Sequence, residues 1–204
     1  MYIPKHYKEE DMVHLVAFMN QYPFALLISQ VDGKPFATHL PFIIEKNQNG
    51  ILLQSHMALA NPQWKQLAGQ QVLIVFSEPH AYISPSLYEK KENVPTWNYI
   101  AVHAYGHTTL IENKDKVEQL LHKTISTFEP AYVAQYKDLN SDYLRRMVKG
   151  IKAFSIEVND VQGKFKLSQN KTIVEQKNIV DHLQKQNENT SVAIAQYMKN
   201  KLPE

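Results

Sequence analysis

A strict two-residue alternation in "VPTWNYIAVHAYGHTTL" (Val94–Leu110) restricts the fold of this chain more than any other feature. Successive side chains of a β-strand point to opposite faces, so the pattern predicts one long, half-buried strand. One face is mostly small or apolar: Asn98, Ile100, Val102, Ala104, Gly106, Thr108 and Leu110. The other face has aromatic and imidazole side chains where water favours charged ones: Trp97, Tyr99, Ala101, His103, Tyr105 and His107. This second face is expected to contact something other than bulk water.

Further strand-like runs are joined by turns. In "FALLISQVDGKPFATHLPFII" the Asp32-Gly33 pair is a strong hairpin signal, because the tight turn needs positive φ at two positions. A second turn, "NQNG" (Asn47–Gly50), leads into "ILLQSH", and the runs Gln71–Glu78 and "IKAFSIEVNDVQG" complete the set. Six short strands joined mainly by turns predict an antiparallel barrel rather than a parallel sheet.

Helices are predicted around these strands. Apolar residues at helical spacing mark three amphipathic stretches: Met12, Leu15, Val16 and Met19; Val117, Leu120, Leu121, Thr124 and Phe128; and Tyr143, Leu144, Met147 and Val148 behind a Ser141 cap. Asn61-Pro62 predicts the start of a short helix. Beyond Lys171 the chain is polar, with two weak helical patterns. The expected organisation is a domain over 1–170 and a helical extension over 171–204.

Composition narrows the functional classes. The 204 residues are 44% apolar, which is enough for a real core, and 22 basic against 20 acidic residues give a net charge of +2. That balance does not favour nucleic acid on electrostatic grounds alone. Without cysteine there is no thiolate catalysis and no Cys-ligated metal. No signal peptide and no run of ~20 apolar residues is present, so a soluble cytoplasmic protein without a membrane segment is expected.

The nine histidines do not predict a metal site. His103 and His107 are four residues apart, which in a strand separates them by ~13 Å, too far to share one ion. No HExxH-type spacing occurs, and neither a G-x-S-x-G elbow nor a G-x-G-x-x-G or phosphate-binding loop is present. Catalytic residues are therefore left unassigned.

Two short stretches carry groups that suit an anion. Ser55, His56, Asn61 and Lys65 surround the predicted helix start and are candidates for a phosphate site, although these residues alone favour an ordinary capped helix with a solvated lysine. In "GKFKLSQNK" (Gly163–Lys171), lysines alternate with amides that can recognise an anionic heterocycle. The alternative is an exposed loop with solvated lysines. The loop "PHAYISPSLY" (Pro79–Tyr88) is rich enough in Tyr, His and Ser to be a lid or a dimer contact.

Six motifs taken in order give the chain a family resemblance. "MYIPKHY", "THLPF", "SHMALANPQW", "AYISPSLY", "VPTWNYIAVHAYG" and "GKFKLSQNK" resemble the PaiB family, the FMN-binding negative transcriptional regulators. The resemblance runs from Met1 to about Lys171. It implies an α+β, mainly β, FMN-binding split β-barrel related to pyridoxamine-phosphate oxidases and flavin reductases. It also implies a homodimer with flavins at the subunit interface.

The resemblance also implies roles for individual residues. Trp97, Asn98 and Tyr99 would lie at or near the isoalloxazine, and Thr38, His39 and Leu40 on the strand whose backbone edge the ring approaches. Ser55, His56, Asn61 and Lys65 would lie in the phosphate region, where "SHMALANP" replaces the Arg/Lys-rich stretch of the oxidase relatives. Lys166 would face the phosphate or the pyrimidine edge, and Gln169 would hydrogen-bond a ring carbonyl or a phosphate oxygen.

Two classes of function follow. The family role is a negative regulator of protease synthesis and sporulation, but no helix-turn-helix signature supports direct DNA binding. The densest basic patch (Arg145, Arg146, Lys149 and Lys152) is as readily a solvated helix face. The alternative is an FMN-dependent oxidoreductase or flavin reductase acting on a small molecule, with any regulatory effect indirect. Whether the chain is an enzyme stays open.

Overall fold

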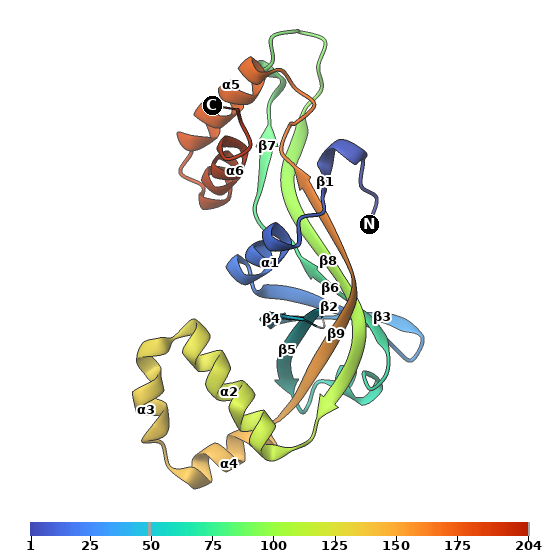
Figure 1. Cartoon of the computed structure of the whole chain (residues 1–204), viewed down its shortest axis with the longest axis vertical. Coiled ribbons are helices and arrows are strands. Elements are labelled where there is room, and N and C mark those ends of the chain that lie inside the picture. Colours follow the sequence, from blue (N-terminus) through green and yellow to red (C-terminus); the bar gives the residue numbers. More distant parts are fainter. Residues whose placement is uncertain (49, 204) are drawn as a thin grey trace. The chain divides into compact units, whose positions relative to one another are not determined.

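The computed structural model describes residues 1–48 and 50–203, and antiparallel strands dominate it (Figure 1). The strands are β1 (Lys8–Glu9), β2 (Phe24–Val31), β3 (Lys34–Pro41), β4 (Ile43–Asn47), β5 (Gly50–Ala58), β6 (Gln71–Phe76), β7 (His80–Ile83), β8 (Thr96–Ile111) and β9 (Ile151–Lys166). The α-helices are α1 (Met12–Gln21), α2 (Lys114–Phe128), α3 (Val133–Lys137), α4 (Ser141–Lys149), α5 (Ile173–Gln184) and α6 (Asn189–Lys199). Short 3-10 helices include η2 (Pro62–Gln66) and η3 (Pro85–Leu87).

The chain divides into two compact units. Unit one contains Met1–Leu15, Ser77–Val102 and the chain from Gln162 onward, and unit two contains Val16–Phe76 and His103–Val161. The 16-residue strands β8 and β9 contribute residues to both units. β8 matches the extent of the alternation over Val94–Leu110, and β9 continues three residues beyond the predicted run Ile151–Gly163.

In unit two, the predicted hairpin is confirmed. β2 pairs with β3 from Phe24↔Pro41 to Val31↔Lys34, and the turn residues Asp32 and Gly33 have φ of 51° and 74°. β4 and β5 form the second hairpin and pair up to Asn47↔Gly50. Within the predicted turn Asn47–Gly50, residue 49 lies outside the described part of the chain.

The run "PFATHLPFII" is two strands rather than one. β3 ends at Pro41 and β4 begins at Ile43, so the break falls at Phe42, which is 1% exposed and packs against Phe76 and Phe154 at ring-centroid distances of 6.0 and 6.4 Å. The strand order β3-β2-β6-β8-β9-β5-β4 puts these two consecutive strands at its opposite ends. In the described residues the sheet is therefore open, as a split barrel requires.

The alternation in β8 is confirmed from Trp97 to Thr108 except at Ala101, which is buried although it lies on the outer face, and beyond it Leu110 is only half-buried. Asn98, Ile100, Val102, Ala104, Gly106 and Thr108 are all buried. On the opposite face Trp97 and His107 are exposed, while Tyr99, His103 and Tyr105 are half-buried. Burial lowers the pKa of His103, which favours the neutral imidazole at this position.

Three helices of unit two follow one another between β8 and β9 (Figure 1). The Asn113 side chain caps α2 by accepting from the Lys116 amide at 3.0 Å. The cap of α4 is Asn140, one residue before the predicted Ser141, and its side chain accepts from the amides of Asp142 and Tyr143. Asn is as good a cap as Ser, so composition alone did not separate the two.

In unit one, α5 and α6 confirm the two helical patterns of the tail, and both lie in the same unit as β7 and the start of β8 (Figure 1). A capping box at Thr172 and Glu175 begins α5. The fully buried residues Leu183, Ile194 and Ala195 supply part of the core of this unit. No helix in the described ranges is both long and apolar enough to cross a membrane.

Candidate functional site

In unit two, one buried glutamine organises several of the predicted site residues. Gln63 is 0% exposed, and its Nε2 donates to Ser29 Oγ at 2.9 Å and to the Phe36 carbonyl at 3.2 Å. Its Oε1 accepts from Thr38 Oγ1 at 2.6 Å, and Thr38 Oγ1 in turn accepts from Asn61 Nδ2 at 3.0 Å. Thr38 and Asn61, which are 23 residues apart in sequence, are thus brought together in one hydrogen-bonded network.

The other residues of the "THL" segment lie on β3, which is at one end of the strand order. His39 is exposed, and its ring stacks on that of Phe24 with centroids 6.1 Å apart. Leu40 is buried at 7% exposure. An edge strand leaves one row of backbone donors and acceptors outside the ladder, so β3 offers backbone groups beside an exposed aromatic surface.

The predicted phosphate region has few free donors. Ser55 is buried, and its hydroxyl donates to the Pro41 carbonyl at 2.6 Å. The first amide of η2, on Gln63, already donates to Asn61 Oδ1 at 2.9 Å. Burial lowers the pKa of His56, which keeps this imidazole neutral at pH 7. The exposed Lys65 is therefore the cation of this group.

In unit one, Trp97 belongs to an exposed aromatic cluster. It is 52% exposed, with its ring centroid 5.8 Å from His80 and 5.7 Å from Tyr82. These three residues line a pocket of about 640 Å³. The same pocket is lined by residues of α5, α6 and their connection: His182, Gln186, Asn187, Glu188, Thr190 and Ser191. Its size is within the usual range for small-molecule pockets, and aromatic and polar walls suit a flat heterocycle.

Asn98 lies on the opposite face of β8 from Trp97. It is 0% exposed, its Oδ1 accepts from Ser168 Oγ at 3.0 Å, and its Nδ2 donates to Met198 Sδ at 3.4 Å. These bonds join β8 to the turn after β9 and to α6, so Asn98 has a structural role in unit one. Tyr99 is half-buried on the Trp97 face, with Lys164 Nζ 5.2 Å from its ring centroid.

Lys166 is held by polar groups at the start of β8. Its ammonium donates to the Thr96 hydroxyl and to the Trp97 carbonyl, the latter at 2.6 Å. Burial, and next the nearby Lys164 ammonium, lower the pKa of Lys166. A charge that is partly desolvated and beside a like charge gains most from an anion.

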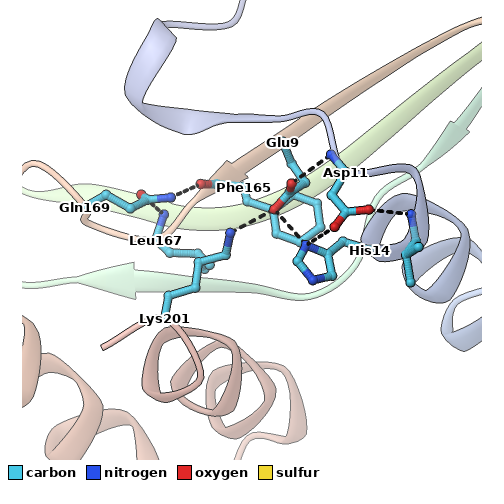
Figure 2. A network of polar contacts seen from close by, with 8 residues as sticks. Glu9, Asp11, His14, Phe165, Leu167, Gln169 and Lys201 are labelled. Carbon is cyan, nitrogen blue, oxygen red and sulfur yellow. Dashed lines mark hydrogen bonds and ion pairs between the residues drawn. The ribbon is translucent and has the colours of Figure 1, made fainter. Parts of the chain in front are cut away.

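Gln169 is bonded within its own turn, as Figure 2 shows. Its Oε1 accepts from the Leu167 amide at 2.8 Å, and its Nε2 donates to the Phe165 carbonyl at 2.5 Å. The same view shows the ion pair between Lys201 and Glu9; its Nζ–Oε2 distance is 2.8 Å. The Gln169 side chain therefore shapes the loop that carries Lys166.

Sequence reasoning did not assign three contributors to the site: Gln63, His80 and Tyr82. Gln63 gave no signal, because nothing in "NPQWKQ" reveals that this side chain points inward from a 3-10 helix. His80 and Tyr82 did give a signal, since the loop "PHAYISPSLY" was too aromatic for a plain connection. The structure puts both beside Trp97 in the same pocket.

An open antiparallel sheet of this order is the split β-barrel of flavin-binding proteins. The Flavocytochrome Anf3 from Azotobacter vinelandii has this fold, with a TM-score of 0.65 and 15% sequence identity over 80% of this chain and 72% of that one. The FAD and heme binding protein from Mycobacterium smegmatis is similar, with a TM-score of 0.61 and 16% identity over 78% and 73%.

The chain belongs to the family described as "Putative FMN-binding domain", whose model matches residues 1–160. It is 37% identical over 205 residues to "Protease synthase and sporulation protein PAI 2" of Bacillus subtilis (strain 168), covering 99% of this chain and 98% of that protein. The resemblance to the PaiB family is confirmed, and the cofactor of this family is FMN.

In the part of the chain that the structure describes, no group of three or more His, Asp or Glu side chains is placed to hold a metal ion.

The chemical types of the residues present, aromatic rings and cations, suit the flat ring and the phosphate of FMN. Unit one offers an exposed aromatic surface at Trp97, which suits a flat ring, and a partly desolvated cation at Lys166. Unit two offers an edge strand and the exposed cation Lys65. With His56 neutral, the phosphate region has less positive charge than an Arg/Lys-rich stretch would supply.

Proposed function

We propose that two groups of residues of this chain contact FMN, and each group is described within its own unit. In unit two these are Thr38, His39, Leu40, Ser55, His56, Asn61 and Lys65. In unit one they are Trp97, Asn98, Tyr99, Lys166 and Gln169. FMN supplies electron-transfer chemistry when bound, and the protein positions it. Trp97 provides a stacking surface and Lys166 a cation, while Asn98 and Gln169 keep the loop around Lys166 in place.

The observation that carries this proposal is the Gln63 network. Its hydrogen bonds fix the side chain of Thr38, which lies on the edge strand β3, and that of Asn61, which is bonded to it, before any ligand arrives. Fixed polar groups lose little conformational entropy on binding, which is the main requirement for tight recognition of a small molecule.

Lys166→Ala is expected to weaken FMN binding by about ten- to a hundred-fold, because a hydrogen bond to a charged group contributes about 1.5–3 kcal/mol. Fluorescence titration of FMN measures the effect, and the unfolding midpoint of the variant shows whether unit one is intact. Lys177→Ala is the matched control, since Lys177 is exposed on α5. Equal FMN affinities for the wild type and Lys166→Ala would remove Lys166 from the site.

The proposal extends to a cytoplasmic homodimer with FMN at the subunit interface, acting as a negative regulator of protease synthesis and sporulation. The exposed aromatic pair Tyr82 (48%) and Trp97 (52%) supports an interface, since aromatic side chains are enriched there. The name of the Bacillus subtilis relative supports the biological process.

Regulation through direct DNA contact is expected to be weak. The basic residues of α4 are exposed, but Arg145 is paired with Asp142 in the same helix turn. A gel shift on promoter DNA of protease genes should show little or no complex. Any complex should decrease steeply with salt and disappear when Arg145 and Arg146 are both changed to Ala. Tight, sequence-specific binding by the pure protein would contradict this expectation.

A further inference from the structure

Unit one contains a second, smaller pocket with an unusual lining. Its volume is about 190 Å³. The side chains that matter most in its wall are Lys166, Lys171, Tyr7, Tyr88, Asn98 and Asn170. The described residues that line it include two lysines and several hydroxyl and amide groups, but neither aspartate nor glutamate. The pocket is therefore positively charged.

Neither lysine has a carboxylate partner within the described residues. Lys166 Nζ contacts the Thr96 hydroxyl and the Trp97 carbonyl. Lys171 Nζ donates to Asn93 Oδ1 at 2.6 Å and lies 3.8 Å from the ring centroid of Tyr88. Neutral groups and a ring face stabilise a partly buried ammonium less than an anion does. Both charges are thus available to a negatively charged ligand.

Tyr88 adds an independent observation. Its side chain is nine-tenths buried, and its hydroxyl has no hydrogen-bond partner among the residues that the structure describes. A buried hydroxyl without a hydrogen-bond partner is unfavourable, and native proteins seldom contain one. Burial, and then the Glu175 carboxylate, raise the pKa of Tyr88, so this hydroxyl is protonated and can donate.

Glu175 is the carboxylate that raises the pKa of Tyr88, and it is already hydrogen-bonded. Its Oε1 accepts from the Glu89 amide at 3.1 Å, and its Oε2 accepts from the Thr172 amide at 3.2 Å. It serves as the capping residue of α5 and is absent from the pocket lining. It does not form an ion pair with Lys166 or Lys171.

We infer that this pocket binds a small oxyanion, a carboxylate or a phosphate monoester, between Lys166 and Lys171 with Tyr88 as an added donor. A volume of about 190 Å³ corresponds to about six water molecules at ~30 Å³ each, too little for a flavin ring system. The site goes beyond the proposed FMN contacts, with which it shares Lys166 and Asn98. Lys171 and Tyr88 belong to this pocket alone.

The test is thermal unfolding of the full chain with inorganic phosphate or acetate as the probe. Each is raised to about 50 mM, with sodium chloride at equal ionic strength as the reference. Ligand binding to the native state raises the unfolding midpoint, here by an expected 2–4 °C, about the effect of a site with a Kd of ~10 mM at this concentration. A rise with phosphate alone assigns the phosphate-ester class, and a rise with acetate alone assigns the carboxylate class. A rise with both supports a general oxyanion site.

Variants test whether the rise of the unfolding midpoint comes from ligand binding in this pocket. Lys171→Met should abolish the rise, while Lys177→Met, an exposed lysine in the same unit, should keep it. Tyr88→Phe removes the unpartnered hydroxyl with little harm to folding and should reduce the rise, which keeps the test valid if Lys171→Met unfolds. FMN affinity should be unchanged in Tyr88→Phe and in folded Lys171→Met. No rise in the wild type, an equal rise in Tyr88→Phe, or a parallel loss of FMN binding would overturn the inference.

Discussion

Gly106→Ala is expected to lower the free energy of unfolding by about 3 kcal/mol, the upper part of the usual range for overpacking. A Cβ atom at Gly106 would lie 2.3 Å from the Glu157 carbonyl oxygen and 2.7 Å from Ile156 Cγ2. The nearer atom is backbone, so it cannot move aside as a flexible side chain does. The change therefore forces β8 away from β9 in unit two, where both strands are central in the sheet order. Urea denaturation followed by circular dichroism measures the loss.

Thr109→Ala is the matched control for Gly106→Ala. Thr109 lies on the same strand and is exposed, so its replacement is expected to change the unfolding free energy by no more than about 0.5 kcal/mol. If Gly106→Ala were as stable as Thr109→Ala, the close approach of β8 and β9 at this point would be wrong.

Gln63→Glu is expected to lower the free energy of unfolding by about 3 kcal/mol or more at pH 7. The fully buried amide donates to the Phe36 carbonyl at 3.2 Å and to the Leu27 carbonyl at 3.4 Å. An ionised carboxylate in its place would face both carbonyl oxygens without a donor, which leaves a buried charge unpaired. The introduced carboxyl should therefore have a raised pKa in the folded state.

A raised carboxyl pKa gives this variant a characteristic pH dependence. Between the pKa of the unfolded chain, about 4.3, and the higher folded value, the folded state binds more protons than the unfolded state. The free energy of unfolding of Gln63→Glu, relative to wild type, should thus fall as pH rises from about 4 to about 7. This range begins near the pKa of the unfolded chain and extends towards the raised pKa of the folded state. Gln71→Glu, on the exposed face of β6, should show no such trend. A pH-independent difference from wild type would mean that Gln63 is not buried in this network.

Local pattern was sufficient to predict much of the fold. The alternation in β8 was readable because each residue's face depends only on its position in the strand, and the Asp32-Gly33 turn because few residues adopt positive φ. The break at Phe42 was not readable, since Phe is equally compatible with a continuous strand. Only the pairing partners on either side, β2 before it and β5 after it, decide where the strand ends.

The candidate site was predictable in part. Thr38 was named from the family resemblance and Asn61 first from the predicted helix start, but the glutamine that joins them depends on contacts between η2 and the β2–β3 hairpin, 25 to 34 residues earlier. Asn98 was expected near the flavin, whereas its amide also joins β8 to Met198, 100 residues later. Long-range contacts of this kind have no local sequence signature.

Sedimentation velocity of the protein with FMN, followed in the visible absorption band of the flavin, tests the central claim most directly. The account predicts that the flavin sediments with the protein, at one FMN per chain, in a species of twice the 23.6 kDa chain mass. Flavin that stays unsedimented in the presence of excess folded protein would contradict FMN binding. Flavin bound to a species of single-chain mass would contradict the interface site.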